Sequence, residues 1–315
     1  MNAFSLRCTI LDTGRTLLLD KLTDIQLAAS LSSPARSLRV TAAVGQLPQE
    51  LRDATLYYGE RELFSGRVDR QEGRLARNGK SVALEARSKG GILLDNESRP
   101  RVLWGTNIAT MFRNTLAPYG FGLYNPQPAR TAAVYSVGKG VSEWDAFCGL
   151  CMRMHSVLPY VEGDTVMVCP PQSGAVLRIS NSGNGVPYSD LRWVHLPYAV
   201  LSRVVIRDEN GSYSTAVQNP AAARYQMQRK RYMIPTAAFE DAPALDANQR
   251  IRASMRERVK VSVTVPEVLE VQCGQQVEIA DTALTLYNLR VEQWKLRANG
   301  GGYVSELTLG DSVYV

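Results

Sequence analysis

The feature that most constrains this chain is an alternation of apolar and polar residues along its first ninety positions. The alternation is clearest over residues 4–10 and returns over 25–31. Because successive side chains of a strand point to opposite faces, a period of two indicates strands with one buried face. Between 54 and 70 the pattern is interrupted at 59–62, which predicts a hairpin. The sequence therefore predicts a compact antiparallel barrel or sandwich at the amino-terminal end.

Near residues 96–100 two helical patterns replace the strands, and we expect a second domain to begin there. Thr106 is predicted to cap the first helix, and Pro118 prevents that helix from continuing. Ser142 and Asp145 resemble a capping box at the start of the second helix. A short apolar strand at 165–169 follows, and two prolines close it. These patterns predict a mixed α/β domain.

The rest of the chain returns to strands, interrupted by a single helix. The strands are predicted at 201–206, 260–265, 276–279, 284–294 and 303–309. Asp246 is predicted to cap the helix, whose narrow apolar stripe is flanked by arginines and so indicates a surface position. Residues 208–243 are predicted to form a long loop, which is uncommon in a compact domain unless the loop is functional. A strand-rich start and end around a mixed middle is compatible with two related barrels that carry an insertion.

Composition limits the classes of protein that need to be considered. The chain has 315 residues, 45% of them hydrophobic and 21% charged, which favours packed domains. No apolar run approaches the roughly 18 residues of a membrane span. Arg7 interrupts what would have to be the apolar region of a signal peptide, so we expect no cleaved signal. Five scattered cysteines favour a reduced protein without a disulfide framework.

Positive charge is concentrated in one part of the chain. The net charge is +6, and residues 224–260 hold nine Lys and Arg against four Asp and Glu. Clustered arginines interleaved with Tyr225 and Tyr232 are compatible with nucleic-acid binding, but the small excess favours a solvated or subunit-contacting segment. The candidate interface residues are Arg224, Arg229, Lys230, Arg231, Arg252 and Arg256.

Signs of catalytic or metal-binding chemistry are weak. Cys148 and Cys151 form a C-x-x-C pair with His155 nearby, which is compatible with a redox or metal site. The pair lies past the first turn of the predicted helix, on its apolar stripe, and no second C-x-x-C completes a zinc site, so we favour packing. His195 lies in an apolar setting and is predicted to be a partly buried structural histidine. No catalytic, cofactor-binding or metal residue is predicted, and we expect no enzyme activity.

Three groups of short motifs occur in a characteristic order along the chain. The first is the strand at 64–69, followed by 84–89, which includes Ala86, and by 93–96. The second is the helix start at 140–145 and the hairpin at 161–166. The third consists of the closing strands at 263–266, 274–277, 289–292 and 307–311.

In this order and spacing the motifs resemble the baseplate hub proteins of Mu-like contractile phage tails and the related late-control D-type tail proteins. The resemblance implies an α+β, mainly β fold of two small antiparallel β-barrel domains that flank an α/β insertion domain. The corresponding boundaries are 1–95, 96–177 and 178–315, the last domain carrying the long basic loop and one surface helix. It also implies a homotrimer whose six barrels form a pseudo-sixfold ring.

Such a ring joins a tail tube to a central spike, so the implied partners are the spike protein, the tube or tube-initiator protein and other baseplate proteins. Nucleic acid would only pass through the lumen. The implied location is the baseplate of a virion tail or tail-like particle assembled in the host cytoplasm. Two alternatives remain open: a tail-associated enzyme such as a cell-wall hydrolase, and a β-rich carbohydrate-binding module. The second would expose a row of aromatic side chains, whereas the four tryptophans are spread singly along the chain.

Overall fold

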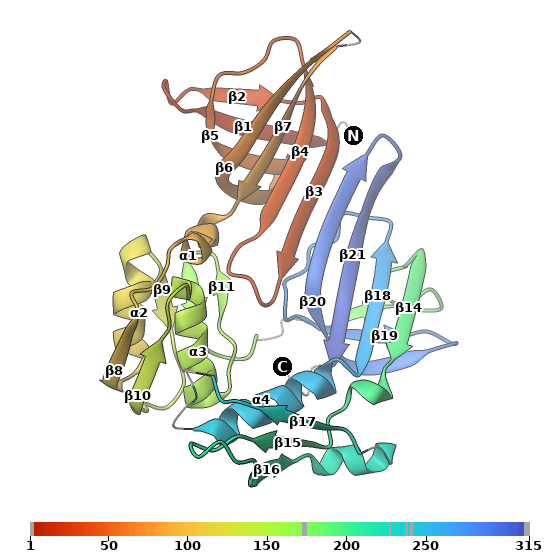
Figure 1. The fold of residues 1–315 in the computed structure, drawn as a ribbon. Helices are drawn as coiled ribbons and strands as arrows, with labels where there is room; N and C mark the ends of the chain where they lie inside the picture. The colour runs from red at the N-terminus through yellow and green to blue at the C-terminus, as the bar shows by residue number, and fades with distance from the viewer. Residues whose placement is uncertain are drawn as a thin grey trace.

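The computed structural model describes residues 3–77, 79–171, 175–226, 228–236, 239 and 242–311. Figure 1 shows a strand-rich part at each end of the chain and a smaller mixed part beside them. This arrangement confirms the α+β, mainly β fold class.

The amino-terminal part is antiparallel, and burial alternates along its strands as the sequence predicts. In β1, for example, Phe4, Leu6 and Cys8 are buried while the residues between them are more exposed. The hairpin at 59–62 is confirmed, because the strands on either side of Gly59 pair with each other. The strands are β1 (Phe4–Ile10), β2 (Thr16–Leu19), β3 (Leu22–Ser30), β4 (Ser37–Val44), β5 (Leu51–Tyr58), β6 (Arg61–Ala76) and β7 (Gly79–Arg87).

The middle part is a small α/β unit with its own core. Both predicted helices are present, and each packs apolar residues such as Met111 and Phe147 against the other. The predicted hairpin is also confirmed, since β11 and β12 pair around Gly163. The elements are η1 (Lys89–Gly91), α1 (Ile92–Asp95), β8 (Arg101–Thr106), α2 (Ile108–Thr115), η2 (Ala117–Tyr119), β9 (Gly122–Tyr124), β10 (Ala132–Val137), α3 (Glu143–His155), β11 (Tyr160–Glu162) and β12 (Thr165–Met167).

The two predicted helix caps in this part have different outcomes. At α3 the prediction is confirmed: Ser142 Oγ accepts from the Asp145 backbone N–H at 3.0 Å and donates to the Asp145 carboxylate at 2.7 Å. At α2 the prediction is wrong by one residue. Thr106 ends β8, and the Asn107 side chain is the cap, accepting from the Thr110 backbone N–H at 2.8 Å.

The carboxy-terminal part contains the predicted strands, two strands that the sequence did not predict (β13 and β14), and an inserted layer. Its main strands are β13 (Leu177–Ile179), β14 (Asp190–His195), β18 (Val259–Val265), β19 (Gln276–Ala280), β20 (Thr285–Asn299) and β21 (Gly302–Asp311). The inserted layer consists of η3 (Pro197–Ala199), β15 (Arg203–Ile206), β16 (Thr215–Gln218), η4 (Pro220–Tyr225), β17 (Lys230–Met233) and α4 (Pro243–Arg256).

The prediction of a long loop over 208–243 is wrong for the described residues. β16 pairs antiparallel and β17 pairs parallel with β15, and together they form a three-stranded sheet. Val204, Met233 and Ile251 are buried together, so α4 covers one face of this sheet as a surface helix does. Each of the two missed strands has only four residues, too few for a periodic pattern to stand out.

The helix cap predicted at Asp246 is also wrong. α4 begins three residues earlier at Pro243, whose fixed φ and missing N–H suit the first helical position. The buried Asp246 carboxylate instead accepts from the Thr236 backbone N–H at 3.1 Å and from Arg250 at 3.2 Å. Asp246 therefore fastens the segment before the helix to the helix itself.

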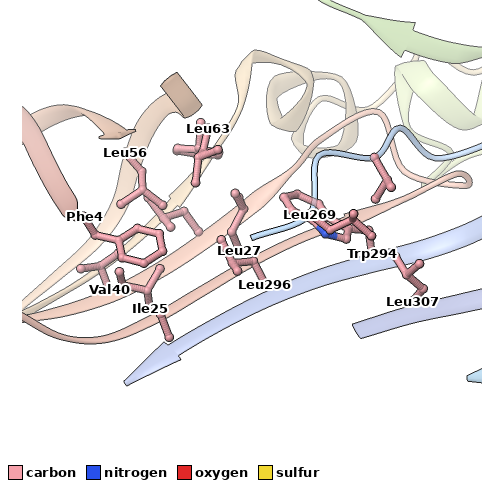
Figure 2. Packing of buried hydrophobic residues seen from close by; sticks show 14 of the residues in the cluster. Phe4, Ile25, Leu27, Val40, Leu56, Leu63, Leu269, Trp294, Leu296 and Leu307 are labelled. Atoms are coloured by element: carbon pink, nitrogen blue, oxygen red, sulfur yellow. The ribbon is translucent and has the colours of Figure 1, made fainter. Parts of the chain in front are cut away.

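The strands of both ends form one sheet with a single hydrophobic core. Its main path runs β14-β18-β21-β20-β3-β4-β7-β6-β5-β1-β2, and in the described residues this path stays open rather than closing into a barrel. β20 lies beside β3 in Figure 1, and in Figure 2 Leu27 of β3 packs against Leu296 of β20. Neither leucine is exposed. The seam between the two ends of the chain is therefore as well buried as either end.

The two ends of the chain repeat the same five-strand unit. The path β3-β4-β7-β6-β5 has the order of β14-β18-β21-β20-β19. Residues 37–87 and 260–310 pair in the same register after a shift of 223 positions (276 − 53, 290 − 67 and 302 − 79), and the register irregularity at Val68 recurs at Val291. The likeness ends at β13, which pairs parallel with β19 where β1 pairs antiparallel with β5. Three pairs of facing residues show the shift. Asp53 faces Arg67 as Gln276 faces Arg290, and Ala76 faces Gly79 as Asn299 faces Gly302. Ser37 faces Arg87 as Lys260 faces Gly310.

Candidate assembly surface

The first group of sequence motifs builds the junction between the amino-terminal sheet and the α/β unit. Arg87, the last residue of β7, donates to Asp69 at 2.6 and 3.2 Å and to Asp95 at 2.8 and 2.7 Å. The hydrogen bonds from Arg87 hold the pKa of Asp95 below its usual value. One guanidinium thus clamps β6 of the sheet to α1 of the next unit, and bidentate pairing fixes its direction.

Two glycines allow the backbone to approach closely at this junction. A Cβ on Gly66 would lie 2.2 Å from the Arg87 carbonyl oxygen, and one on Gly90 would lie 2.0 Å from the Pro34 carbonyl oxygen. Ser88 also binds the neighbouring loop, since its hydroxyl accepts from the Arg36 backbone N–H at 2.9 Å. Ala86 is buried in β7 before the turn, so the turn itself does not depend on it.

Lys89 connects the first group of motifs to the second. Its ammonium group donates to the Gly120 carbonyl at 2.8 Å, pairs with Asp164 at 3.1 Å and lies 4.8 Å from the centre of the Phe121 ring. An open cleft of about 470 Å³ lies between the β11–β12 hairpin, which carries Asp164, and the loop after β3. Lys89 therefore ties the junction after β7 to two loops of the α/β unit.

The six basic residues predicted at an interface lie on η4, on β17 and directly before it, and on α4. Arg256 pairs within the chain with Glu292 of β20 at 3.4 Å, while Arg252 is exposed on the same helix. Arg224 and Arg229 both bind groups of the same layer: Arg224 donates to the Tyr225 hydroxyl, and Arg229 donates to the Tyr198 carbonyl. Lys230 and Arg231 lie on β17, and both are exposed.

Sequence reasoning missed an ion pair that fixes the inserted layer to the main sheet. Arg258 donates to Asp311 of β21 at 2.6 Å and to the Tyr225 hydroxyl at 2.9 Å, and the Arg258 and Asp311 side chains are only 12% and 13% exposed. Desolvation of Arg258 opposes its charge, but the interactions with Asp311 and Tyr225 together outweigh it, so the pKa of Arg258 is raised. No motif marks this pair, because its members lie 53 positions apart.

The residues considered for chemistry are largely structural in their surroundings. Cys148 and Cys151 are buried in the core of the α/β unit, and burial raises the pKa of both thiols. Among the described residues no group of three or more His, Cys, Asp or Glu side chains could hold a metal ion. The prediction of a partly buried His195 is wrong: it is exposed on β14, 5.7 Å from the Trp193 ring.

One polar cluster pins the loop before β14 to the turn after β19. The Asp281 carboxylate accepts from the Asn181 backbone N–H at 3.0 Å, from the Tyr188 hydroxyl at 2.9 Å and from the Ser182 hydroxyl at 2.9 Å. These hydrogen bonds, that of Asn181 first, hold the pKa of Asp281 well below its usual value. The cluster positions a loop next to the edge of the sheet.

The fold is that of phage tail proteins, as comparison with solved structures shows. The crystal structure of prophage MuSo2 43 kDa tail protein from Shewanella oneidensis is similar over 99% of this chain and 99% of that one, with a TM-score of 0.79 at 13% identity. The tail protein from Neisseria meningitidis matches 98% of this chain and 96% of its own, with a TM-score of 0.77 at 14% identity.

A third structure links the same fold to a related machine. It is an E. coli component of the type VI secretion system, described as similar to the bacteriophage T4 tail proteins gp27 and gp5. It matches 96% of this chain and 76% of its own, with a TM-score of 0.55 at 11% identity. No protein-family model and no curated protein matches the chain. Among the described residues, no helix combines the length and the apolar character that crossing a membrane would require.

Proposed function

We propose that this protein is a structural subunit of a contractile-tail baseplate, a homotrimeric hub whose pseudo-sixfold ring joins the tail tube to the central spike. The observation that carries the proposal is the five-strand unit repeated within one chain. A trimer of such chains presents six similar units, so one closed ring can meet a sixfold partner on one side and a threefold partner on the other. The likeness to tail proteins of Mu-like prophages supports the same conclusion.

The partners follow from this placement. They are two further copies of the chain, the spike protein, the tube or tube-initiator protein and other baseplate proteins, in a virion tail or tail-like particle assembled in the host cytoplasm. The proposed domains are 1–95, 96–177 and 178–315, and the hydrogen bond between Arg87 and Asp95 lies directly before the first boundary. Arg224, Lys230, Arg231 and Arg252 are proposed interface residues, because their side chains are exposed.

A role without catalysis fits the buried thiols and the structural use of the polar clusters better than the alternatives do. For a carbohydrate-binding module, the exposed tryptophans should share a sheet face. Trp104 lies on β8 of the α/β unit and Trp193 on β14 of the main sheet, so they belong to separate sheets.

Two measurements on the purified full chain test the proposal. Sedimentation velocity with electron microscopy should show trimers that form rings with a central hole and bind a spike or tube protein. A peptidoglycan-degradation assay should show no activity above that of a heat-inactivated sample. A monomer that hydrolyses peptidoglycan would replace the hub with the enzyme alternative.

A further inference from the structure

Within the described residues, the outer edge of β14 and the second half of β6 have no partner strand on one side, although their counterparts in the repeat pair with each other. β20 pairs with β19 up to Arg290 and with β3 from Gln293 onward. Its counterpart β6 pairs with β5 only as far as Arg67, and beyond that point the described residues provide it with β7 alone. β14, the counterpart of β3, has β18 as its one neighbour in the described chain. Each copy thus carries one free strand and one free place for such a strand.

We infer that β14 of one copy pairs antiparallel with the second half of β6 in the next copy. This contact would repeat between subunits the pairing that joins β3 to β20 within a subunit. The inference rests on the proposed trimer and names the surface that forms it, with a second copy of this chain as the partner. Because the two edges belong to different strands, the contact is head-to-tail and must close into a ring to satisfy every copy. One internal and one intersubunit seam per chain give six seams in a trimer.

The internal seam predicts the register of the intersubunit seam. β3 and β14 correspond after a shift of 166 positions, since Asp24 faces Thr41 as Asp190 faces Thr264, and 190 − 24 is 166. In β3 and β20 the facing pairs include Leu27 with Leu296 and Ile25 with Ala298. Adding 166 to the β3 numbers and subtracting 223 from the β20 numbers gives the corresponding pairs between β14 and β6. Trp193 then lies opposite Gly73, and Leu191 opposite Leu75, in the next copy.

The side chains at these positions suit a buried seam. Leu75 is 69% exposed and Trp193 is 49% exposed, which is unusual for large apolar residues at strand edges. Gly73 pairs with the buried Val82 and Trp193 with the buried Val261, so both lie on the core-facing side of the sheet. The Leu47 side chain of the same chain lies over Gly73, 3.0 Å from where a Cβ would be, so the Trp193 ring would pack against Leu47 at this position.

The opposite, solvent-facing side of the seam carries charges that it can accommodate. Arg192 would face Arg74 there, and like charges directly opposite each other are unfavourable. Glu72 lies two positions from Arg74 on the same side, within diagonal reach of Arg192. Because Arg70 already pairs with the Glu72 carboxylate at 2.7 Å, that carboxylate offsets only part of the repulsion between the two arginines.

Cross-linking tests the register directly. Facing Cβ atoms in an antiparallel pair lie about 4.5–5.5 Å apart, which a disulfide tolerates with small adjustment. The full chain carrying both Leu75→Cys and Leu191→Cys should therefore oxidise to covalent dimers and closed trimers on a non-reducing gel. The chain carrying Arg74→Cys and Leu191→Cys is the matched control, since its thiols point to opposite faces and should not cross-link. Ile25→Cys with Ala298→Cys should form a bond within one chain.

A substitution provides a second readout. Trp193→Asp should raise the dissociation constant of the trimer at least a hundredfold without lowering the melting temperature of the isolated chain. Trp104→Asp, which changes a 76% exposed tryptophan of the α/β unit, should leave the trimer intact. Suppose the wild type forms trimers, but the chain with Leu75→Cys and Leu191→Cys does not cross-link and Trp193→Asp does not weaken the trimer. That result would overturn this inference and leave the hub proposal standing. A wild-type chain that stays monomeric at high concentration would overturn both.

Discussion

Gly66→Ala should destabilise the chain more than any other single-methyl addition to the amino-terminal strands. The new Cβ would lie 2.2 Å from the Arg87 carbonyl oxygen and 2.6 Å from the Phe64 ring, whereas such contacts in proteins stay beyond 3.0 Å. The carbonyl belongs to the backbone, so β6 and β7 must separate where they carry the Arg87 clamp. Overpacking that moves backbone costs about 3 kcal/mol, which lowers the melting temperature by about 4–5 °C in a chain of 315 residues.

Thermal unfolding followed by circular dichroism measures the effect, with Gly45→Ala as the matched control. Gly45 has an ordinary φ and open space around its Cα, so an added methyl meets nothing. That variant should melt within about 2 °C of the wild type, because an unstrained Gly to Ala change is worth under about 1 kcal/mol. A Gly66→Ala protein as stable as Gly45→Ala would refute the close approach of β6 to Arg87.

Three further predictions concern the polar clusters and the thiols. A double-mutant cycle with Arg87→Met and Asp95→Asn should give a coupling free energy of about 1 kcal/mol in urea unfolding, because the pair is partly exposed; additive effects would show that the clamp contributes nothing. The folded-state pKa of Asp281 lies below its unfolded value, so its stabilisation is complete above about pH 4 and is lost as the pH falls further. Asp281→Asn should therefore reduce the loss of stability in acid, and an unchanged acid midpoint would contradict this role. Burial and raised pKa values should protect Cys148 and Cys151 from a thiol reagent at pH 8 until the chain unfolds, so rapid labelling of either in native protein would exclude a packed pair.

Local patterns in the sequence predicted much of the fold. Period-two alternation identified strands such as β1, because one buried face leaves that signature in neighbouring residues. The capping box at Ser142 identified α3, because its hydrogen bonds span only three residues. β16 and β17 were missed, since four-residue strands that depend on a neighbouring strand have little signal of their own. His195 was misplaced because an apolar sequence setting does not reveal whether a strand lies at an edge.

The candidate assembly surface was harder to predict, since it depends on pairing between distant residues. The basic residues stood out by charge, yet Arg256 of α4 pairs with Glu292 of strand β20. The repeat does leave a faint trace, because Arg67-Val68-Asp69 recurs as Arg290-Val291-Glu292 at the shift of 223 positions. Three similar residues cannot establish a duplication by themselves, whereas the shared pairing register of two five-strand units does.

The central claim is that copies of this chain close around a threefold axis through their repeated strand units. Native mass spectrometry of the purified full chain over a range of concentrations tests it most directly. We expect a discrete species with three times the mass of the chain, without dimers or open-ended oligomers at saturation. A chain that remains monomeric, or that forms only twofold dimers, would contradict the claim.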